Sequence, residues 1–268
     1  SVGFVVACAF TGDGAIGSAA LEAPRYFGAS PGALEQAKQQ LASGDTSSRP
    51  ALDALVEEAD RALLVEPPSI TQKTRLAASR NPHDYYSQAP YWWPDPGKQD
   101  GLPYIARDGH VNPEARTGES DPERLALMGE TVETLALAYY FTGKEAYAEH
   151  AARCLRVWFL DPATRMTHHM NYAQAVPGKN TGRGIGIIEA GGLVETGDAA
   201  GLLVGSPHWP VTDDAALRAW LSEFLDWLLH SKNGLEEAAM KQNHGTMYDL
   251  RVSRLALALG RRELAKET

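Results

Sequence analysis

The chain has 268 residues, which is enough for a full hydrophobic core in one large domain or two small ones. Its formal net charge of −9 gives no general basic field for nucleic acid or an anionic membrane, so a polyanionic ligand would need a local cluster of Arg and Lys. The two cysteines, Cys8 and Cys154, fit no metal-ligand spacing, and we expect Cys154 to be a buried small hydrophobe.

The chain starts with a short apolar run, Val2–Phe10, followed by small residues. The run is too short to span a bilayer but suits the end of a secretory signal with a cleavage site near 18–20. The residues before Cys8 also resemble a bacterial lipoprotein cleavage box, which would make Cys8 a lipid anchor. Both interpretations predict a periplasmic or secreted protein in which 1–29 is an export-signal remnant or linker. The alternative is an apolar terminus without such a role.

Helical periodicity dominates the rest of the chain, and no segment shows convincing strand alternation. The sequence therefore predicts an all-α fold of helical hairpins, with Gly143 and Gly260 as helix stops. Ser30 and Thr212 are the expected N-caps of the first helix and of the helix over 213–230. The predicted helices are 31–41, 51–64, 121–141, 144–160, one from the glycine-rich stretch 182–186 to about 203, 213–230, 235–240 and one that begins near His244.

Two long segments lack periodicity, 69–118 and 161–182. The first is rich in proline and aromatic residues, and its rings form either a rigid wall for a flat ligand such as a sugar or a satellite core under a long loop. The second contains His168 and His169, which are adjacent and cannot both face one metal from a helix, so no metal site and no cofactor is predicted. Arg183 is expected at the head of a closely packed helix.

The stretch around Asn243 and His244 sets an amide and an imidazole side by side where a loop enters a helix. There the helix dipole disfavours imidazolium and stabilises a nearby anion, which makes His244 a candidate base. The alternative is that Asn243 caps the helix and His244 is a surface residue.

The end of the chain repeats an earlier pattern. Residues 258–265 have the same order as 141–148: helix, Gly stop, charged residues, new helix. We therefore expect a single domain over 30–268 that lacks its last hairpins.

Four separated motifs resemble the alginate lyase superfamily of polysaccharide lyases, and most closely its branch of alginate and glucuronan lyases related to family 38. The motifs are Tyr85–Pro96, Thr142–Asp161, Met170–Gln174 and Asn243–Thr246. The resemblance covers about 30–268. It implies an incomplete (α/α) toroid of helical hairpins and cleavage of a 1,4-linked polyuronate by β-elimination, which leaves a 4,5-unsaturated end.

The resemblance also implies roles for individual residues. Asn243 would neutralise the substrate carboxylate, and His244 would assist or act as the base. Arg183 would add positive charge. The residues that would line the sugar subsites are Tyr85, Tyr86, Trp92, Trp93, Tyr172 and Gln174. A catalytic Tyr, which the family places well downstream of the Asn-His pair, has no counterpart up to Thr268.

Two other functions fit parts of the sequence. A glycoside hydrolase on a similar helical toroid would need a pair of carboxylates, for which Asp84, Asp95 and Glu189 are candidates. A non-catalytic protein that binds acidic polysaccharide would keep the aromatic wall without needing His244.

Overall fold

The computed structural model describes residues 26–29 and 32–268, and this part of the chain is predominantly helical, which confirms the predicted all-α class. The α-helices are α1 (Ala33–Ala42), α2 (Arg49–Ala62), α3 (Pro122–Thr142), α4 (Glu145–Leu155), α5 (Gly191–Ala199), α6 (Val211–His230), α7 (Lys232–Ala238), α8 (Asn243–Ala258) and α9 (Arg262–Glu267). Shorter helical turns are η1 (Ile70–Gln72), η2 (Pro113–Arg116), η3 (Arg156–Leu160), η4 (Gly184–Ala190) and η5 (Ala200–Leu203).

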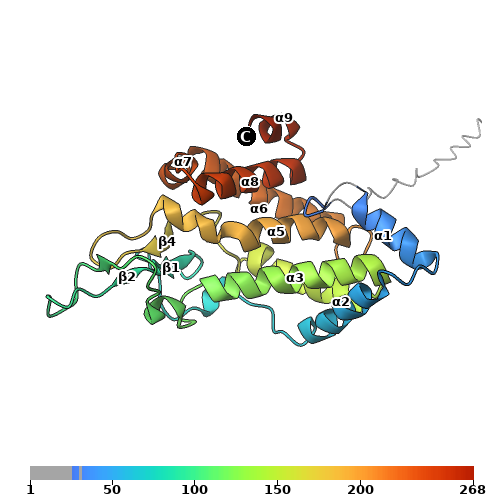
Figure 1. The fold of residues 1–268 in the computed structure, drawn as a ribbon, viewed down its shortest axis with the longest axis horizontal. Coiled ribbons are helices and arrows are strands. Elements are labelled where there is room, and N and C mark those ends of the chain that lie inside the picture. The colour runs from blue at the N-terminus through green and yellow to red at the C-terminus, as the bar shows by residue number, and fades with distance from the viewer. Residues whose placement is uncertain (1–25, 30–31) are drawn as a thin grey trace, which may run out of the picture.

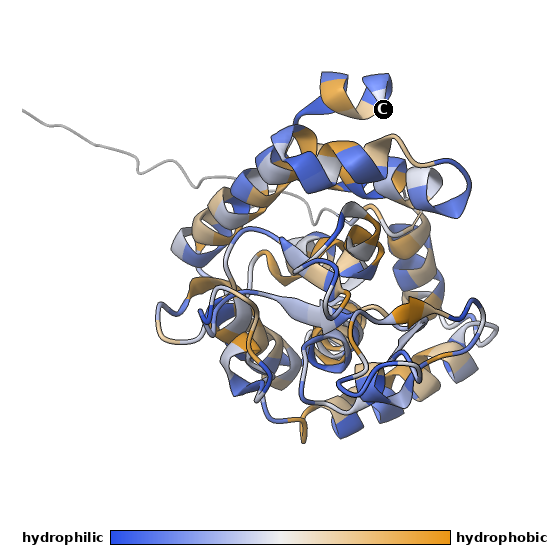
Figure 2. Ribbon diagram, turned by 90° about the vertical axis from the view of Figure 1, so that its left-hand side faces the viewer, coloured by the Kyte–Doolittle hydropathy of each residue, from blue (hydrophilic) through white to orange (hydrophobic). Residues whose placement is uncertain are grey.

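The long helix α3 lies at the centre of the core and packs against α2, α4 and α5 (Figure 1). It starts with Pro122, whose fixed φ suits a first helical turn, and ends before Gly143, which adopts φ 67°. Leu125, Val132 and Leu135 are almost completely buried. Figure 2 shows polar and apolar residues alternating along the outer helices, as expected where one face of a helix packs inward. The closure of these hairpins into a toroid stays a prediction.

Most predicted helices are confirmed, with corrections. The single helix predicted from 182–186 to about 203 is instead the 3₁₀-helical stretch η4, the short α-helix α5 and the turn η5. The helix predicted over 235–240 begins earlier and ends earlier, as α7. The helix that follows Gly143 is α-helical only to Leu155 and continues as a π-helical turn, η3, to Leu160. Thr212 is not an N-cap, because α6 begins one residue earlier, at Val211. The carbonyl of Pro210 accepts hydrogen bonds from the N–H groups of Asp213 and Asp214, and this places the helix start ahead of Thr212.

The expectation that the irregular segments contain no strands is wrong. Strand β1 (Tyr86–Gln88) pairs in parallel with β4 (Tyr172–Ala175), and β2 (Trp92–Trp93) pairs antiparallel with β3 (Ile105–Ala106). Each strand has only two to four residues, which is too short for a recognisable alternation. The labelled strands gather at one end of the molecule (Figure 1).

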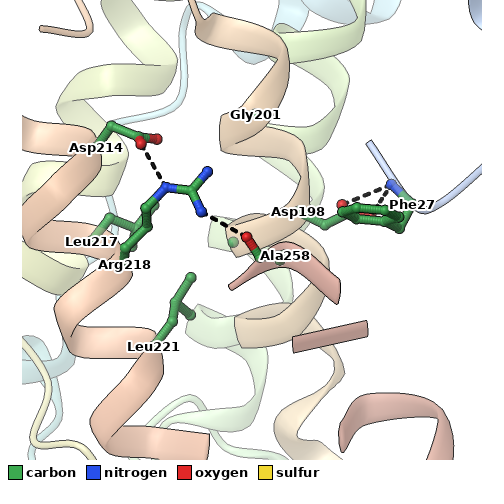
Figure 3. Close-up of a pocket in the computed structure, with 9 residues that line it drawn as sticks. Phe27, Asp198, Gly201, Asp214, Leu217, Arg218, Leu221 and Ala258 are labelled. Atoms are coloured by element: carbon green, nitrogen blue, oxygen red, sulfur yellow. Dashed lines mark hydrogen bonds and ion pairs between the residues drawn. The ribbon is translucent and has the colours of Figure 1, made fainter. Parts of the chain in front are cut away.

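Residues 26–29 contact the helical body through Phe27, whose N–H donates to both oxygens of Asp198 at 2.8 and 2.9 Å. Beside this contact, Arg218 bridges Asp214 and the carbonyl of Ala258 (Figure 3). The pocket between these residues measures about 20 Å³, which is room for a water molecule and not for a sugar. We therefore interpret this junction as packing.

Several predictions concern residues outside the described part of the chain. The export signal and the lipid anchor at Cys8 lie there, and the division into 1–29 and 30–268 stays a prediction. The expected N-cap at Ser30 is wrong, because α1 begins at Ala33 and Gly32 occupies its N-cap position. Among the described helices, none combines the length and the apolar character that a membrane crossing requires.

Cys154 is buried, as expected. Burial raises the pKa of its thiol to about 12, so the thiol stays protonated and unreactive at neutral pH.

Candidate active site

A carboxylate near the end of η4 forms the centre of one polar cluster. Glu189 Oε2 accepts hydrogen bonds from the hydroxyls of Tyr85 at 2.9 Å and Ser87 at 2.5 Å. Its other oxygen, Oε1, accepts from Nε2 of Gln174 at 3.2 Å. Ser87 Oγ also accepts the backbone N–H of Gln174 at 2.7 Å, so β1, β4 and η4 are joined through one set of hydrogen bonds.

The environment of Glu189 favours its neutral form. Removal from bulk water raises the pKa of the carboxyl. The hydrogen bonds from Ser87, Tyr85 and Gln174, and the positive charge of Arg116, lower it but do not reverse the shift. Glu189 is half-buried as a residue. A carboxyl with a raised pKa that is held by several hydrogen bonds is a candidate functional group.

Close backbone packing fixes this cluster, as the glycine-rich stretch predicts. A Cβ atom on Gly186 would lie 2.6 Å from Cβ of Ala173, and one on Gly184 would lie 2.6 Å from the carbonyl oxygen of Asn233. Because real Cβ atoms do not approach other atoms so closely, only glycine lets η4 pack directly on β4 and α7. Glu189, which lies near the end of η4, is therefore held against the two strands.

Arg183 lies at the N-terminal end of η4, as predicted, and contacts the same cluster. Its Nε donates to the carbonyl of Gln174 at 3.1 Å, and its Nη2 donates to the side-chain oxygen of Gln174 at 2.9 Å. Its guanidinium carbon is 5.9 Å from the ring centre of Trp92, and Nζ of Lys179 is 4.3 Å from the same ring. Two cations therefore flank one indole beside the Glu189 cluster.

Three of the aromatic residues predicted to line sugar subsites, Tyr86, Trp93 and Tyr172, do not join this cluster. Tyr86 and Tyr172 pack together with Ala77 and Ala175 in a separate small core. Tyr85 bonds to Glu189 from a fully buried position in the main core. Trp93 donates its indole N–H to the carbonyl of His110 at 2.9 Å and lies under the guanidinium of Arg107. Of the six predicted residues, Tyr85, Trp92 and Gln174 are thus brought together with Arg183.

A second polar cluster lies at the start of α8. Nδ1 of His244 is 2.8 Å from Oε1 of Glu237, a buried residue of α7. Asn243 is the first residue of α8 and is exposed, while Gln242, with φ 68°, occupies the cap position without a side-chain cap bond. The alternative in which Asn243 caps the helix is therefore wrong. Asn243 instead presents its amide to solvent beside a half-buried imidazole.

Glu237 is a residue that the sequence analysis did not identify. Burial raises the pKa of its carboxyl, and the hydrogen bond from His244 only partly offsets this effect. Its second oxygen, Oε2, has no hydrogen-bond partner among the described residues. A buried carboxylate that is bonded through one oxygen to an imidazole fixes the orientation of the ring, as in catalytic His-carboxylate pairs. No local pattern around Glu237 predicts this pairing, because the contact joins two helices.

The turn η4 connects the two clusters. The backbone N–H of Gly184 donates to Oε2 of Glu236 on α7 at 3.2 Å. The guanidinium of Arg251, on α8, donates to the carbonyls of Ile187 at 3.3 Å and Ile188 at 2.6 Å. Arg183 and Glu189 lie at the two ends of η4, so the helices that carry Glu237 and His244 pack on the same element as the first cluster.

The adjacent histidines have separate partners. Nδ1 of His168 is 2.9 Å from Glu223, and Nε2 of His169 is 3.5 Å from Asp84. In the part of the chain that the structure describes, no group of three or more His, Cys, Asp or Glu side chains is placed to hold a metal ion. The two histidines thus face different carboxylates.

Comparison with known proteins places this site in a family. The family model described as alginate lyase matches residues 69–268, which include both polar clusters. The chain belongs to the alginate lyase family. A solved alginate lyase from Bacteroides ovatus is similar, with 39% sequence identity and a TM-score of 0.83 over 92% of this chain. The match covers 64% of that chain, so the present chain spans less than two thirds of its relative. No curated protein matches.

Membership of the alginate lyase family confirms the superfamily that the sequence motifs indicated.

Asp84 and Asp95, two of the carboxylates considered for a glycoside hydrolase, have other hydrogen-bond partners. Asp84 is buried and accepts hydrogen bonds from Ser79 and Thr167, and Asp95 accepts from the N–H of Gly97 in a turn. Among the described residues, neither shares a hydrogen-bond donor with Glu189.

Proposed function

We propose that this chain carries the active-site residues of a polysaccharide lyase that cleaves a 1,4-linked polyuronate, alginate or glucuronan, by β-elimination. A base removes the proton on C5 of a uronate residue, the C4–O4 bond breaks, and a double bond forms between C4 and C5. The departing O4 takes up a proton. The observation that carries this proposal is the pairing of His244 with buried Glu237 beside the exposed amide of Asn243.

The pairing supports a role for His244 in proton transfer. If Glu237 accepts the proton on Nδ1, the other ring nitrogen, Nε2, is left as an acceptor. His244 lies in the first turn of a 16-residue helix, and its side chain is 18% exposed. An oriented imidazole that retains solvent contact is placed to act as a general base.

The same helix start supports stabilisation of the intermediate. Removal of the C5 proton transfers negative charge to the uronate carboxylate, and the reaction is fast only if donors already point at that charge. Asn243 supplies an amide N–H, and the first turn of α8 supplies backbone N–H groups. Arg183 adds positive charge in the neighbouring cluster around Glu189.

The distribution of charge supports an anionic polymer as the substrate. The two irregular segments, 69–118 and 161–182, contain eight Lys and Arg and six Asp and Glu. The rest of the chain contains 17 Lys and Arg and 28 Asp and Glu. Because the strands and the side chains that bond to Glu189 belong to these segments, a small excess of positive charge lies beside the Glu189 cluster, despite the net charge of −9.

The test is the ultraviolet absorbance of the unsaturated product, measured with alginate, polymannuronate, polyguluronate and glucuronan. Because the chain spans 64% of its relative, both this chain and a C-terminally extended form should be assayed. We expect His244→Ala to lower kcat by about 10²–10⁴-fold, the usual contribution of a general base. His230→Ala is the matched control, since His230 is exposed and bonds only within its own helix among the described residues.

Three results would contradict the proposal. Full activity of a folded His244→Ala variant would show that another group is the base. New reducing ends without ultraviolet absorbance would indicate the hydrolase alternative. Binding of the polymers without any cleavage by the extended form would indicate a binding protein.

A further inference from the structure

A second pocket lies on the face of the β1–β4 pair that is turned away from Glu189. It has a volume of about 300 Å³, which is within the range of small-ligand sites. Tyr85 and Ser87 bond to Glu189, whereas Tyr86, between them in β1, lines this pocket. The residues that line it include Arg75, Tyr86, Ala175, Asn180 and Thr181.

The pocket contains a cation without a counter-ion. The guanidinium carbon of Arg75 lies 5.8 Å from the ring centre of Tyr86. Arg75 is half-buried, and among the described residues its side chain forms no ion pair and no hydrogen bond. Its backbone N–H donates a hydrogen bond to the carbonyl of Glu119. The planar donor fork of an arginine matches a carboxylate, so an anionic group in the pocket would complete this site.

The other polar groups of the pocket are suited to donate hydrogen bonds. Oδ1 of Asn180 accepts the N–H of Val176, which leaves its amide N–H₂ for a ligand. Burial raises the pKa of Tyr86, so its phenol stays protonated and can donate. The residues that line the pocket include no Asp or Glu. A donor-rich pocket with one aromatic ring and no acid favours a carboxylate carried on a compact, partly apolar body, such as a uronate ring.

The loop between β4 and η4 links this pocket to the active site. Lys179 and Arg183 on this loop lie by the indole of Trp92, while Asn180 and Thr181 line the pocket. One short loop therefore contributes to both the pocket and the active site. A polyuronate chain that crosses this loop would place one uronate residue in the pocket and another at the active site.

We propose that the pocket binds a uronate residue of the polymer that is remote from the bond being cleaved. Arg75 receives its carboxylate, the ring of Tyr86 packs against the sugar, and Asn180 and Thr181 bond to its hydroxyls. This subsite rests on the proposed polyuronate substrate and adds to it a requirement for chain length. It makes Arg75 a residue that distinguishes long oligomers from short ones.

The test is calorimetric titration of saturated di-, tetra- and hexauronates into the full chain in a His244→Ala background, where cleavage is suppressed. Arg75→Gln is compared with Lys98→Gln, which removes one positive charge at an exposed position of the same segment. We expect Arg75→Gln to weaken binding of tetra- and hexauronate by about tenfold or more, the effect of losing a hydrogen-bonded charge. Arg75→Gln should leave the affinity for diuronate unchanged. Lys98→Gln should change neither the affinity for diuronate nor that for tetra- and hexauronate.

Each other result overturns the subsite in a distinct way. If Arg75→Gln binds hexauronate as tightly as its parent, the pocket takes no part and the lyase proposal stands. If diuronate binding falls equally, Arg75 belongs to the central site. If inorganic phosphate competes as well as hexauronate, the pocket is a general anion site. If the parent binds no oligouronate and the ultraviolet assay is also negative, the polyuronate proposal itself is wrong.

Discussion

His244 and Glu237 lie on successive helices, with Nδ1 and Oε1 2.8 Å apart. The side chain of Glu237 is fully buried and that of His244 is 18% exposed, so the pair has one end in the core and the other at the surface. The inner carboxylate sets the orientation of the ring, and the outer edge of the ring remains available to a substrate. The motif at the start of α8 therefore depends on a residue of α7.

Substitution of Glu237 by Gln should lower activity without unfolding the protein. Gln keeps the size of the side chain but loses the charge that favours one ring orientation. We expect kcat to fall at least about tenfold, and less than the 10²–10⁴-fold expected for loss of the base itself. The urea midpoint should not fall, because Gln removes a buried carboxylate whose pKa is already raised by burial. Kinetic assays and urea denaturation on the same samples measure both effects.

Glu149→Gln provides the control, because Glu149 is exposed on α4 and its side chain forms no hydrogen bond or ion pair with the described residues. It should leave both kcat and the midpoint unchanged. A Glu237→Gln variant with unchanged kcat, or with a rise in KM alone, would show that Glu237 does not position the base.

The sequence predicted those helix ends that are encoded locally. Pro122 and Gly143 mark the ends of α3 because each fixes the backbone at its own position. The start of α8 was predicted for the same reason, since Asn243 and His244 are adjacent and precede an apolar stripe. Strands β1 and β4 were missed because each is short and its partner is distant in sequence.

The site could be predicted only where its residues are contiguous. Asn243 with His244, and Tyr85 with Gln174, belong to motifs that can be read along the chain. Glu237 and Ser87 were not identified, because their contacts cross from one element to another. Glu189 was considered only as a hydrolase carboxylate. The structure instead places it at the centre of three hydrogen bonds, from Tyr85, Ser87 and Gln174.

The raised pKa of Glu189 predicts a dependence of stability on pH. In the fold the protonated carboxyl is favoured more than in the unfolded chain, so this group contributes stability at low pH. That contribution is lost as the pH rises above the ordinary value of 4.5 and through the raised pKa. Glu189→Gln should therefore show a flatter decline of the urea midpoint with rising pH than the wild type. Parallel curves for the two proteins would contradict a raised pKa, and Glu149→Gln should follow the wild type.

The buried ion pair of Lys73 and Asp121 supports β1 from the side opposite β4. Both side chains are fully buried, with Nζ 3.1 Å from Oδ2, and the same oxygen accepts the N–H of Tyr86 at 2.8 Å. Burial raises the pKa of Asp121 to about 6, and it lowers that of Lys73. The pair therefore holds β1 at Tyr86. The residues on either side of Tyr86, Tyr85 and Ser87, donate hydrogen bonds to Glu189.

Removal of one partner of this pair should destabilise the protein strongly. We expect Lys73→Met or Asp121→Asn to lower the free energy of unfolding by about 3–5 kcal/mol, because each leaves a buried polar group uncompensated. The double variant should be less destabilised than the sum of the two. The exposed pair Arg49 and Asp53 is the control, with about 0–1 kcal/mol expected. Urea denaturation measures all of these, and equal losses for Asp121→Asn and Asp53→Asn would contradict the role of the buried pair.

A methyl group at Gly186 should separate η4 from β4. The added Cβ would lie 2.6 to 2.7 Å from the side chain and backbone of Ala173, and backbone cannot move aside without shifting the strand that carries Gln174. Overpacking of this kind costs about 1–3 kcal/mol. Because Glu189 accepts a hydrogen bond from Gln174, kcat should fall as well.

Gly191→Ala is the matched control, since a Cβ atom at Gly191 would meet nothing closer than 3.6 Å. At the start of α5 it should be neutral or stabilising by about 0.5–1 kcal/mol. If Gly186→Ala matched Gly191→Ala in both urea midpoint and kcat, the close contact between η4 and β4 would not be what positions Glu189.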